Sequence, residues 1–251
     1  MEPLPTLRVV RDSFAGRPAW ATAVAEATLK RVAAGELGPV LHLHRTSAEM
    51  AFSRQDANAA GFDRAVEAAR NAGYKPVVRL VGGRAAAFHE GTLAFAVSLP
   101  DAHPERRTEE RFTMAANLIA GALADLGLDA RVGQLEGEYC PGDWSVNLAG
   151  RIKVAGIGQR MVRGGAHIGG VIVVTDTARL AEGIVPVYRA LELPLDESTI
   201  GSIEDEHPGI TLSTAEDAIL KLFAADWQLE DWQFDDDTFE LARQLESRHR
   251  A

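Results

Sequence analysis

Residues 145–174 read SVNLAGRIKVAGIGQRMVRGGAHIGGVIVV, and this stretch decides the fold class. Apolar residues alternate with polar or small ones in three runs, which is the period of a half-buried strand. Ala149-Gly150 separates the first two runs, and Arg163-Gly164-Gly165 separates the next two. Glycine supplies the backbone freedom that tight turns require. The stretch therefore predicts three short strands joined by turns.

The flanking sequence adds helices and further strands. Strands are expected at 39–45, 75–81 and 85–100, the last broken by a turn at Glu90-Gly91. Apolar residues at helical spacing predict helices at 17–35, 63–71, 109–126, 177–183, 186–191, 213–225 (capped by Ser213 or Thr214) and 235–248. Helices and hairpins interleave without regular βαβ alternation. We therefore predict an α+β fold with a mixed, mainly antiparallel central sheet flanked by helices.

Composition excludes several classes of protein. The formal net charge is −10, from 36 acidic and 26 basic residues, which argues against a general nucleic-acid binder. A single cysteine in 251 residues cannot form an internal disulfide. The N-terminal sequence has no apolar core of signal-peptide type, and no apolar run reaches the length of a membrane span. We expect a cytoplasmic protein that binds neither nucleic acid nor membrane.

A glycine pair follows the predicted strand at 75–81. The sequence from Arg79 to His89 is RLVGGRAAAFH, in which Gly82 and Gly83 precede Arg84, Ala85 and further alanines. Paired glycines let a ligand approach the backbone closely, and Arg79 is suited to an anion or a carbonyl. A tight hairpin explains the same residues equally well. The spacing matches neither a Walker loop nor a GxGxxG fingerprint, so it does not indicate a nucleotide site.

Cys140 lies in Glu138-Tyr139-Cys140-Pro141-Gly142-Asp143. A free cysteine is more often a small buried apolar residue than a nucleophile. Proline and glycine directly after Cys140 place it on a loop, where reactive groups are more frequent. A nearby cation would lower the pKa of the thiol and make it a nucleophile.

Lys153 opens the run KVAGIGQR, which also contains Gly156 and Gln159. Lys153 is either an exposed edge-strand residue that discourages aggregation or a partly desolvated cation aimed at a thiolate or oxyanion. Composition does not decide between these two. His89 and His167 lack a third ligand at metal spacing, so no metal site is expected. His42 and His44 alternate along one strand and are expected at the surface.

These three segments, taken in order, resemble the lipoate-protein ligase and octanoyltransferase family, which has a biotin/lipoate protein ligase type of catalytic domain. Arg79 to His89 resembles the family's Arg-x-x-Gly-Gly-Gly-Ala-x-x-His segment, and Lys153 to Gln159 resembles its Lys-Ile-x-Gly-x-x-Gln motif. The Cys140 segment is similar to the cysteine-dependent octanoyl-[glycine cleavage H protein]:protein N-octanoyltransferase branch. Arg84 stands where the family has a third glycine, so we expect it to narrow the acyl slot or to contact an anion.

The resemblance implies an octanoyl or lipoyl transferase with residues 1–180 as catalytic domain and 181–251 as a helical extension packed on it. Cys140 and Lys153 would be catalytic: Cys140 would carry the acyl group as a thioester, and Lys153 would polarise the acyl carbonyl. The substrate-binding residues would be Arg79, Gly82, Gly83, Arg84, Ala85, His89, Gly156 and Gln159. Partners would be lipoyl-domain proteins (the glycine cleavage H protein and 2-oxoacid dehydrogenase E2 subunits) or acyl carrier protein. The transferase would need no cofactor.

Two other functions remain open at this level. An ATP-dependent lipoate or octanoate ligase would use Lys153 with an acyl-adenylate, would need ATP and magnesium, and would leave Cys140 incidental. A non-catalytic module would bind an acyl group or a lipoyl domain without transferring anything.

Overall fold

The computed structural model describes residues 3–251 and contains one large mixed sheet and one small sheet. Within those residues the large sheet has eight strands in the order β11-β1-β2-β6-β10-β9-β8-β7. Their bounds are β1 Thr6–Val10, β2 Val40–Arg45, β6 Thr92–Asp101, β7 Ala130–Val132, β8 Val146–Leu148, β9 Ile152–Val162, β10 Gly164–Val173 and β11 Gln228–Asp231. Within this large sheet, among residues 3–251, only β1 pairs in parallel, with β2 and β11. The predicted α+β class and the mainly antiparallel sheet are confirmed.

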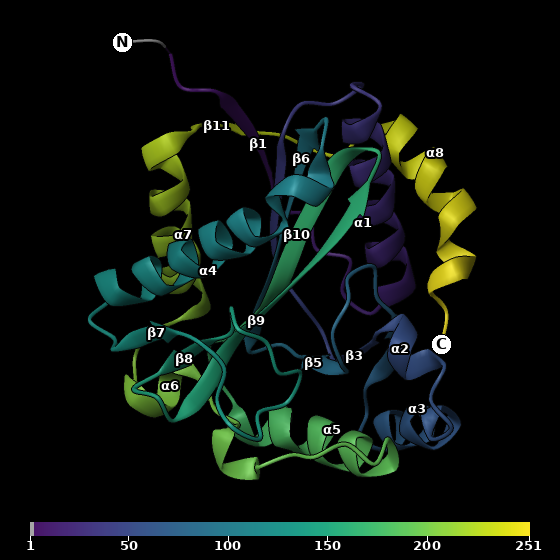
Figure 1. Ribbon diagram of the computed structural model, residues 1–251, viewed down its shortest axis with the longest axis vertical. Coiled ribbons are helices and arrows are strands. Elements are labelled where there is room, and N and C mark those ends of the chain that lie inside the picture. Colours follow the sequence, from purple (N-terminus) through teal and green to yellow (C-terminus); the bar gives the residue numbers. More distant parts are fainter. Residues whose placement is uncertain (1–2) are drawn as a thin grey trace.

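Residues 145–174 form β8, β9 and β10 with the two predicted turns. β9 and β10 are longer than expected, 11 and 10 residues, and cross the centre of the molecule together (Figure 1). Along β10, backbone atoms of β9 lie so close that a Cβ on Gly170 would fall 2.0 Å from the Gly156 carbonyl oxygen. Glycine therefore allows the close strand packing at this point as well as the turns.

Helices cover both faces of the large sheet (Figure 1). α4 (Thr108–Asp125) and α7 (Leu212–Asp226) cover one face and enclose the main apolar core. α1 (Pro18–Ala33) covers the other, where it crosses β6 and β10, and α8 (Asp236–Leu245) packs against α1. The cap of α7 is Thr211, whose side chain accepts from the Thr214 amide, so the predicted caps Ser213 and Thr214 were wrong.

The small sheet has the order β4-β3-β5, from β3 (Glu49–Phe52), β4 (Lys75–Val78) and β5 (Ala86–Phe88). It packs with α3 (Phe62–Asn71) and α5 (Thr177–Ala190) around a second apolar core, and α2 (Arg54–Ala57) follows β3. The turn at Glu90-Gly91 does not close a hairpin, because β5 pairs with β3 and β6 pairs with β2 and β10. The chain crosses from one sheet to the other at this turn, so the site can form between them.

The predicted domain boundary at residue 180 falls inside α5. α5 is one helix with Pro186 inside it, where two short helices were predicted. After it come α6 (Ile203–Glu206), α7, β11 and α8. β11 pairs with β1 and thereby extends the large sheet, so the C-terminal segment contributes to the central layer as well as packing on it. Across residues 3–251, no helix is long and apolar enough to cross a membrane.

Candidate functional site

A cavity of about 140 Å³ lies on the α1 face of the large sheet. Cross-strand partners form two rows over β2, β6, β10 and β9: His42, Ala96, Gly169 and Gly158 in one, and His44, Ala94, Val171 and Gly156 in the other. Cross-strand partners lie on the same face of a sheet, so the small residues of the central strands make a low floor. This floor leaves room for a narrow apolar ligand.

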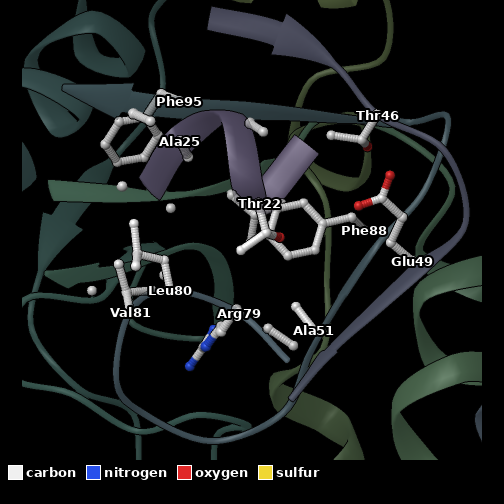
Figure 2. A pocket seen from close by; sticks show the side chains of 18 of the residues that line it. Thr22, Ala25, Thr46, Glu49, Ala51, Arg79, Leu80, Val81, Phe88 and Phe95 are labelled. Carbon is white, nitrogen blue, oxygen red and sulfur yellow. The ribbon is translucent and has the colours of Figure 1, made fainter. Parts of the chain in front are cut away.

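The roof of the cavity comes from α1 and from the segment that follows β4. Ala21, Thr22 and Ala25 of α1 line it, together with the segment Arg79–Val81. In Figure 2, Ala25 and Phe95 lie at one side of the cavity and Thr46 and Glu49 at the other, with Leu80 and Val81 between Ala25 and Arg79. A Cβ on Gly158 would lie 2.8 Å from Cγ2 of Val81, so glycine is required where floor and roof meet.

Histidines form part of the cavity lining; His42 is buried and His44 is half-buried, so the prediction that both are surface residues was wrong. The rings of His42 and His44 stack with their centroids 3.9 Å apart, and both line the cavity with His167. Burial lowers the pKa of His42 and of His167 to about 4 and that of His44 well below its usual value. The imidazoles are therefore neutral at physiological pH.

Glu49 is a half-buried carboxyl in the cavity wall, and we predict that it makes stability depend on pH. Burial raises its pKa to about 7, against weaker opposing effects of the Ser47 hydroxyl and the Lys75 charge. The folded protein then binds a proton that the unfolded chain has lost, so its stability falls as pH rises from about 4.5 to 7. Glu49→Gln is expected to raise the unfolding free energy, relative to wild type, by about 2 kcal/mol more at pH 8 than at pH 5.

Urea unfolding at both pH values measures this difference. Glu109→Gln, the same change at an exposed position of α4, is the control. An equal effect of Glu49→Gln at pH 5 and pH 8 would contradict the prediction.

Cys140 borders the cavity, and two donors surround its sulfur. Arg79 Nη2 lies 3.4 Å from Sγ, and the Arg84 amide nitrogen lies 3.2 Å from it. The backbone of Cys140 has φ of 45°, in the left-handed region that favours glycine. A residue held in this conformation needs surrounding contacts that fix it, and such residues concentrate at functional sites.

The Cys140 thiol has a lowered pKa. Burial by itself would raise the pKa of this thiol, but the charges of Arg79 and Lys153 lower it, and so do the hydrogen bonds from Arg79 and from the Arg84 amide. The net shift is downward, which increases the fraction of thiolate at neutral pH. Cys140 therefore has the environment of a nucleophile as well as access to a cavity.

Lys153 is completely buried, which excludes the reading of an exposed edge-strand residue. Its Nζ lies 2.9 Å from Glu138 Oε1, 2.9 Å from the Tyr139 carbonyl oxygen and 2.7 Å from the Cys140 carbonyl oxygen. An ammonium group has three hydrogens, so these three acceptors use all of them. Lys153 thus holds the Cys140 loop, and direct donation to an oxyanion would require one of these bonds to break.

The structure explains separately why residue 83 is glycine and where the side chain of Arg84 lies. Gly83 has φ of 99°, and a Cβ there would lie 2.6 Å from Arg79 Nη2 and 2.8 Å from Cys140 Sγ. A side chain at this position would push the sulfur from its donors. Arg84 turns away from the cavity wall and pairs with the buried Asp56, Nη1 to Oδ1 at 3.3 Å. The side chain of Arg84 therefore does not narrow the cavity, which was one of the two expectations, and the anion that it contacts is the Asp56 carboxylate.

The other predicted residues divide between the cavity and its support. Arg79 and Gly156 line the cavity with Cys140 and Lys153. Gly82 and Ala85 lie outside the wall, and their carbonyl groups accept from Arg79 and Tyr188. The His89 ring is buried and accepts from the Gly91 amide, and the Gln159 side chain bonds Arg111 and the Thr108 carbonyl, so neither side chain reaches the cavity.

Two supporting residues were missed at the level of sequence. Glu138, 2% exposed, accepts from Lys153, from the Ser145 hydroxyl and from the Leu135 amide. Tyr188 of α5 accepts a hydrogen bond from the Cys140 amide. Glu138 stands two residues before Cys140, which was a signal; Tyr188 lies 48 residues after Cys140, and nothing in its local pattern marks it.

A family model described as the lipoyl protein ligase A/B catalytic domain matches residues 17–224. The chain belongs to this family. The matched residues 17–224 include the floor, α1, Cys140, Lys153 and Tyr188.

Curated relatives in this family carry transferase names. The chain is 30% identical over 146 residues, 58% of its length, to octanoyl-GcvH:protein N-octanoyltransferase of Geobacillus kaustophilus. It is 30% identical over 114 residues, 45% of its length, to lipoyl-GcvH:protein N-lipoyltransferase of Listeria monocytogenes. The matches span 51% and 41% of these relatives, about half of their length or less.

The fold is also that of solved members of the family. A crystal structure of lipoate-protein ligase A bound with ATP superposes with a TM-score of 0.77 over 97% of this chain and 95% of that one. The two sequences are 19% identical, so the comparison supports the fold.

Proposed function

We propose that the protein transfers an octanoyl or lipoyl group between lysine side chains of lipoyl-domain proteins, through a thioester on Cys140. The observation that carries the proposal is the position of Cys140. Its sulfur faces Arg79 and the Arg84 amide beside a narrow cavity with a floor mostly of small residues. The names of the curated relatives support the same acyl groups and the glycine cleavage H protein as donor.

The first half-reaction loads the enzyme. The Cys140 thiolate attacks the carbonyl carbon of an acyl-lysine amide on the donor; the C–S bond forms, the C–N bond breaks, and the donor amine leaves after gaining a proton. Arg79 faces the sulfur directly, at 3.4 Å. Lys153 acts through its charge and through its hydrogen bond to the Cys140 carbonyl, 2.7 Å long. These cations stabilise the thiolate before attack and the negative charge that develops on the carbonyl oxygen.

The second half-reaction unloads the enzyme. The ε-amine of a lysine on the acceptor lipoyl domain attacks the thioester carbonyl; a C–N bond forms, the C–S bond breaks, the amine loses a proton and the Cys140 thiolate returns. Over the whole cycle one lysine amide is broken and another lysine amide is formed, so donor and product are close in free energy. The cycle therefore needs no nucleotide.

Nucleotide-free transfer is the experiment that tests the proposal. The protein is treated with apyrase and incubated with octanoylated glycine cleavage H protein and an unmodified E2 lipoyl domain. We expect the intact mass of the lipoyl domain to rise by one octanoyl group. Octanoyl-acyl carrier protein and free octanoate, each with and without ATP, serve as alternative donors.

The outcomes separate the three functions. Transfer from the acylated H protein without nucleotide supports the proposal. Transfer from free octanoate only with ATP and magnesium would identify a ligase, and binding of the lipoyl domain without transfer from any donor would identify a binding module. Either of the last two results would overturn the proposal.

A further inference from the structure

The backbone of Cys140 is held from both sides. Its carbonyl oxygen accepts from Lys153 Nζ of β9, and its amide donates to the Tyr188 hydroxyl of α5. The conformation of the residue is set by rotations between that amide and that carbonyl. Two anchors on separate elements therefore account for the left-handed φ of 45° at a non-glycine residue.

Tyr188 also connects the Cys140 loop to the segment before β5, which carries the sulfur's second donor. Its hydroxyl, which accepts from Cys140, lies 3.1 Å from the Ala85 carbonyl oxygen and donates to it. The preceding residue, Arg84, donates its amide to Cys140 Sγ at 3.2 Å. A closed ring results: Cys140 amide to Tyr188, Tyr188 to Ala85, and Arg84 back to the sulfur.

We infer that Tyr188 is a positioning residue for the nucleophile, whose hydroxyl keeps the Cys140 sulfur against the Arg84 amide and Arg79. The role assigned to Cys140 here rests on the proposed function. Tyr188 is 2% exposed, and burial raises the pKa of its phenol well above the usual value, so the hydroxyl stays a donor through the physiological range. Neither the sequence pattern nor the two predicted catalytic residues include it.

A matched pair of tyrosines allows the inference to be tested. Tyr188 and Tyr74 are both 2% exposed and both pack in the second apolar core. The Tyr74 hydroxyl donates to the Arg179 carbonyl of α5 and does not contact the Cys140 loop. Tyr188→Phe and Tyr74→Phe therefore each remove one hydroxyl that donates to a backbone carbonyl, but only Tyr188→Phe also removes a hydrogen bond to Cys140.

The rate of alkylation by iodoacetamide, measured against pH, reports the ionisation of the single cysteine without any acyl donor. The charged and titratable groups that face Cys140 are Arg79, Arg84 with Asp56, Glu138, Tyr139, Lys153 and Tyr188. We expect Tyr188→Phe to raise the midpoint of the profile by about one pH unit and to lower the rate at pH 7 up to about tenfold. Tyr74→Phe is expected to keep the wild-type midpoint. A wild-type midpoint in Tyr188→Phe would overturn the inference.

Hydrogen exchange of the Cys140 amide gives a second measurement, and its result for the wild-type protein does not depend on whether a variant folds. Labelling with ¹⁵N-cysteine gives one backbone signal, because the chain has one cysteine. We expect the Cys140 amide of the wild-type protein to exchange slowly although it lies in a loop, and Tyr188→Phe to remove this protection. Fast exchange in the wild-type protein would overturn the inference. If the alkylation and exchange results are as expected but the wild-type protein transfers no acyl group, only the proposed function is contradicted.

Discussion

Cys140→Ala is expected to lower acyl transfer at least about 10³-fold, because it removes the atom that carries the acyl group. Wild-type protein incubated with acylated donor should gain the mass of one octanoyl group, and the variant should gain none. The adduct should disappear with hydroxylamine at neutral pH, which cleaves thioesters. The variant should remain folded, because the side chain is small and partly exposed and because Lys153 and Tyr188 bond the backbone of residue 140.

Cys140→Ser provides the control for shape. A hydroxyl keeps an acceptor in front of Arg79 and the Arg84 amide, but it does not ionise near neutral pH. Cys140→Ser is therefore expected to bind acylated donor as the wild type does and to lose transfer nearly as fully as Cys140→Ala. If Cys140→Ala retained a tenth or more of wild-type transfer, the sulfur would not be the acyl carrier.

The fold followed from sequence where local patterns determine it. Alternating residues and glycine turns at 145–174 predicted β8, β9 and β10 because period and turn chemistry are local properties. The chain's crossing at Glu90-Gly91 was not predictable in this way. A turn between two strands indicates where the chain bends, and only the partner strands, β3 for β5 and β2 and β10 for β6, decide whether a hairpin forms.

The histidines show a related limit. Alternation correctly placed His42 and His44 on one face of β2, but it does not tell whether that face is covered. β2 lies between β1 and β6, and the rings of Phe14 and Phe234 pack against the His42 ring, so His42 is buried while it lines the cavity. Burial of a strand face is decided by residues elsewhere in the chain.

The candidate site was predictable to the extent that its residues lie in short motifs. Arg79, Cys140, Lys153 and Gly156 come from three such motifs and share one cavity. The contacts between motifs were not predictable, because they depend on how loops cross in space. Glu138 as the partner of Lys153 and Tyr188 as the partner of Cys140 are contacts of this kind.

Lys153→Met is expected to lower the unfolding free energy by about 3 to 5 kcal/mol, because it leaves the Glu138 carboxylate buried without its cation. Glu138 and Lys153 have side chains that are 0% exposed, so water cannot replace the lost partner. Lys221→Met is the control, because it breaks an ion pair at the surface. The Lys221 side chain is 72% exposed, and that of its partner Asp125 is 47% exposed. That pair should be worth less than about 1 kcal/mol. Urea unfolding of the three proteins measures both effects.

The double variant Lys153→Met/Glu138→Leu separates the structural role of Lys153 from its chemical role. With both charges gone, no unpaired ion is buried, so we expect the double variant to recover about 2 kcal/mol or more relative to Lys153→Met. Transfer is expected to stay at least about tenfold below wild type in both variants. The Cys140 carbonyl has lost its donor, and the thiol has lost one of the two charges that lower its pKa. If the double variant regained stability and wild-type transfer together, Lys153 would serve the fold alone, and the chemistry would rest on Cys140 and Arg79.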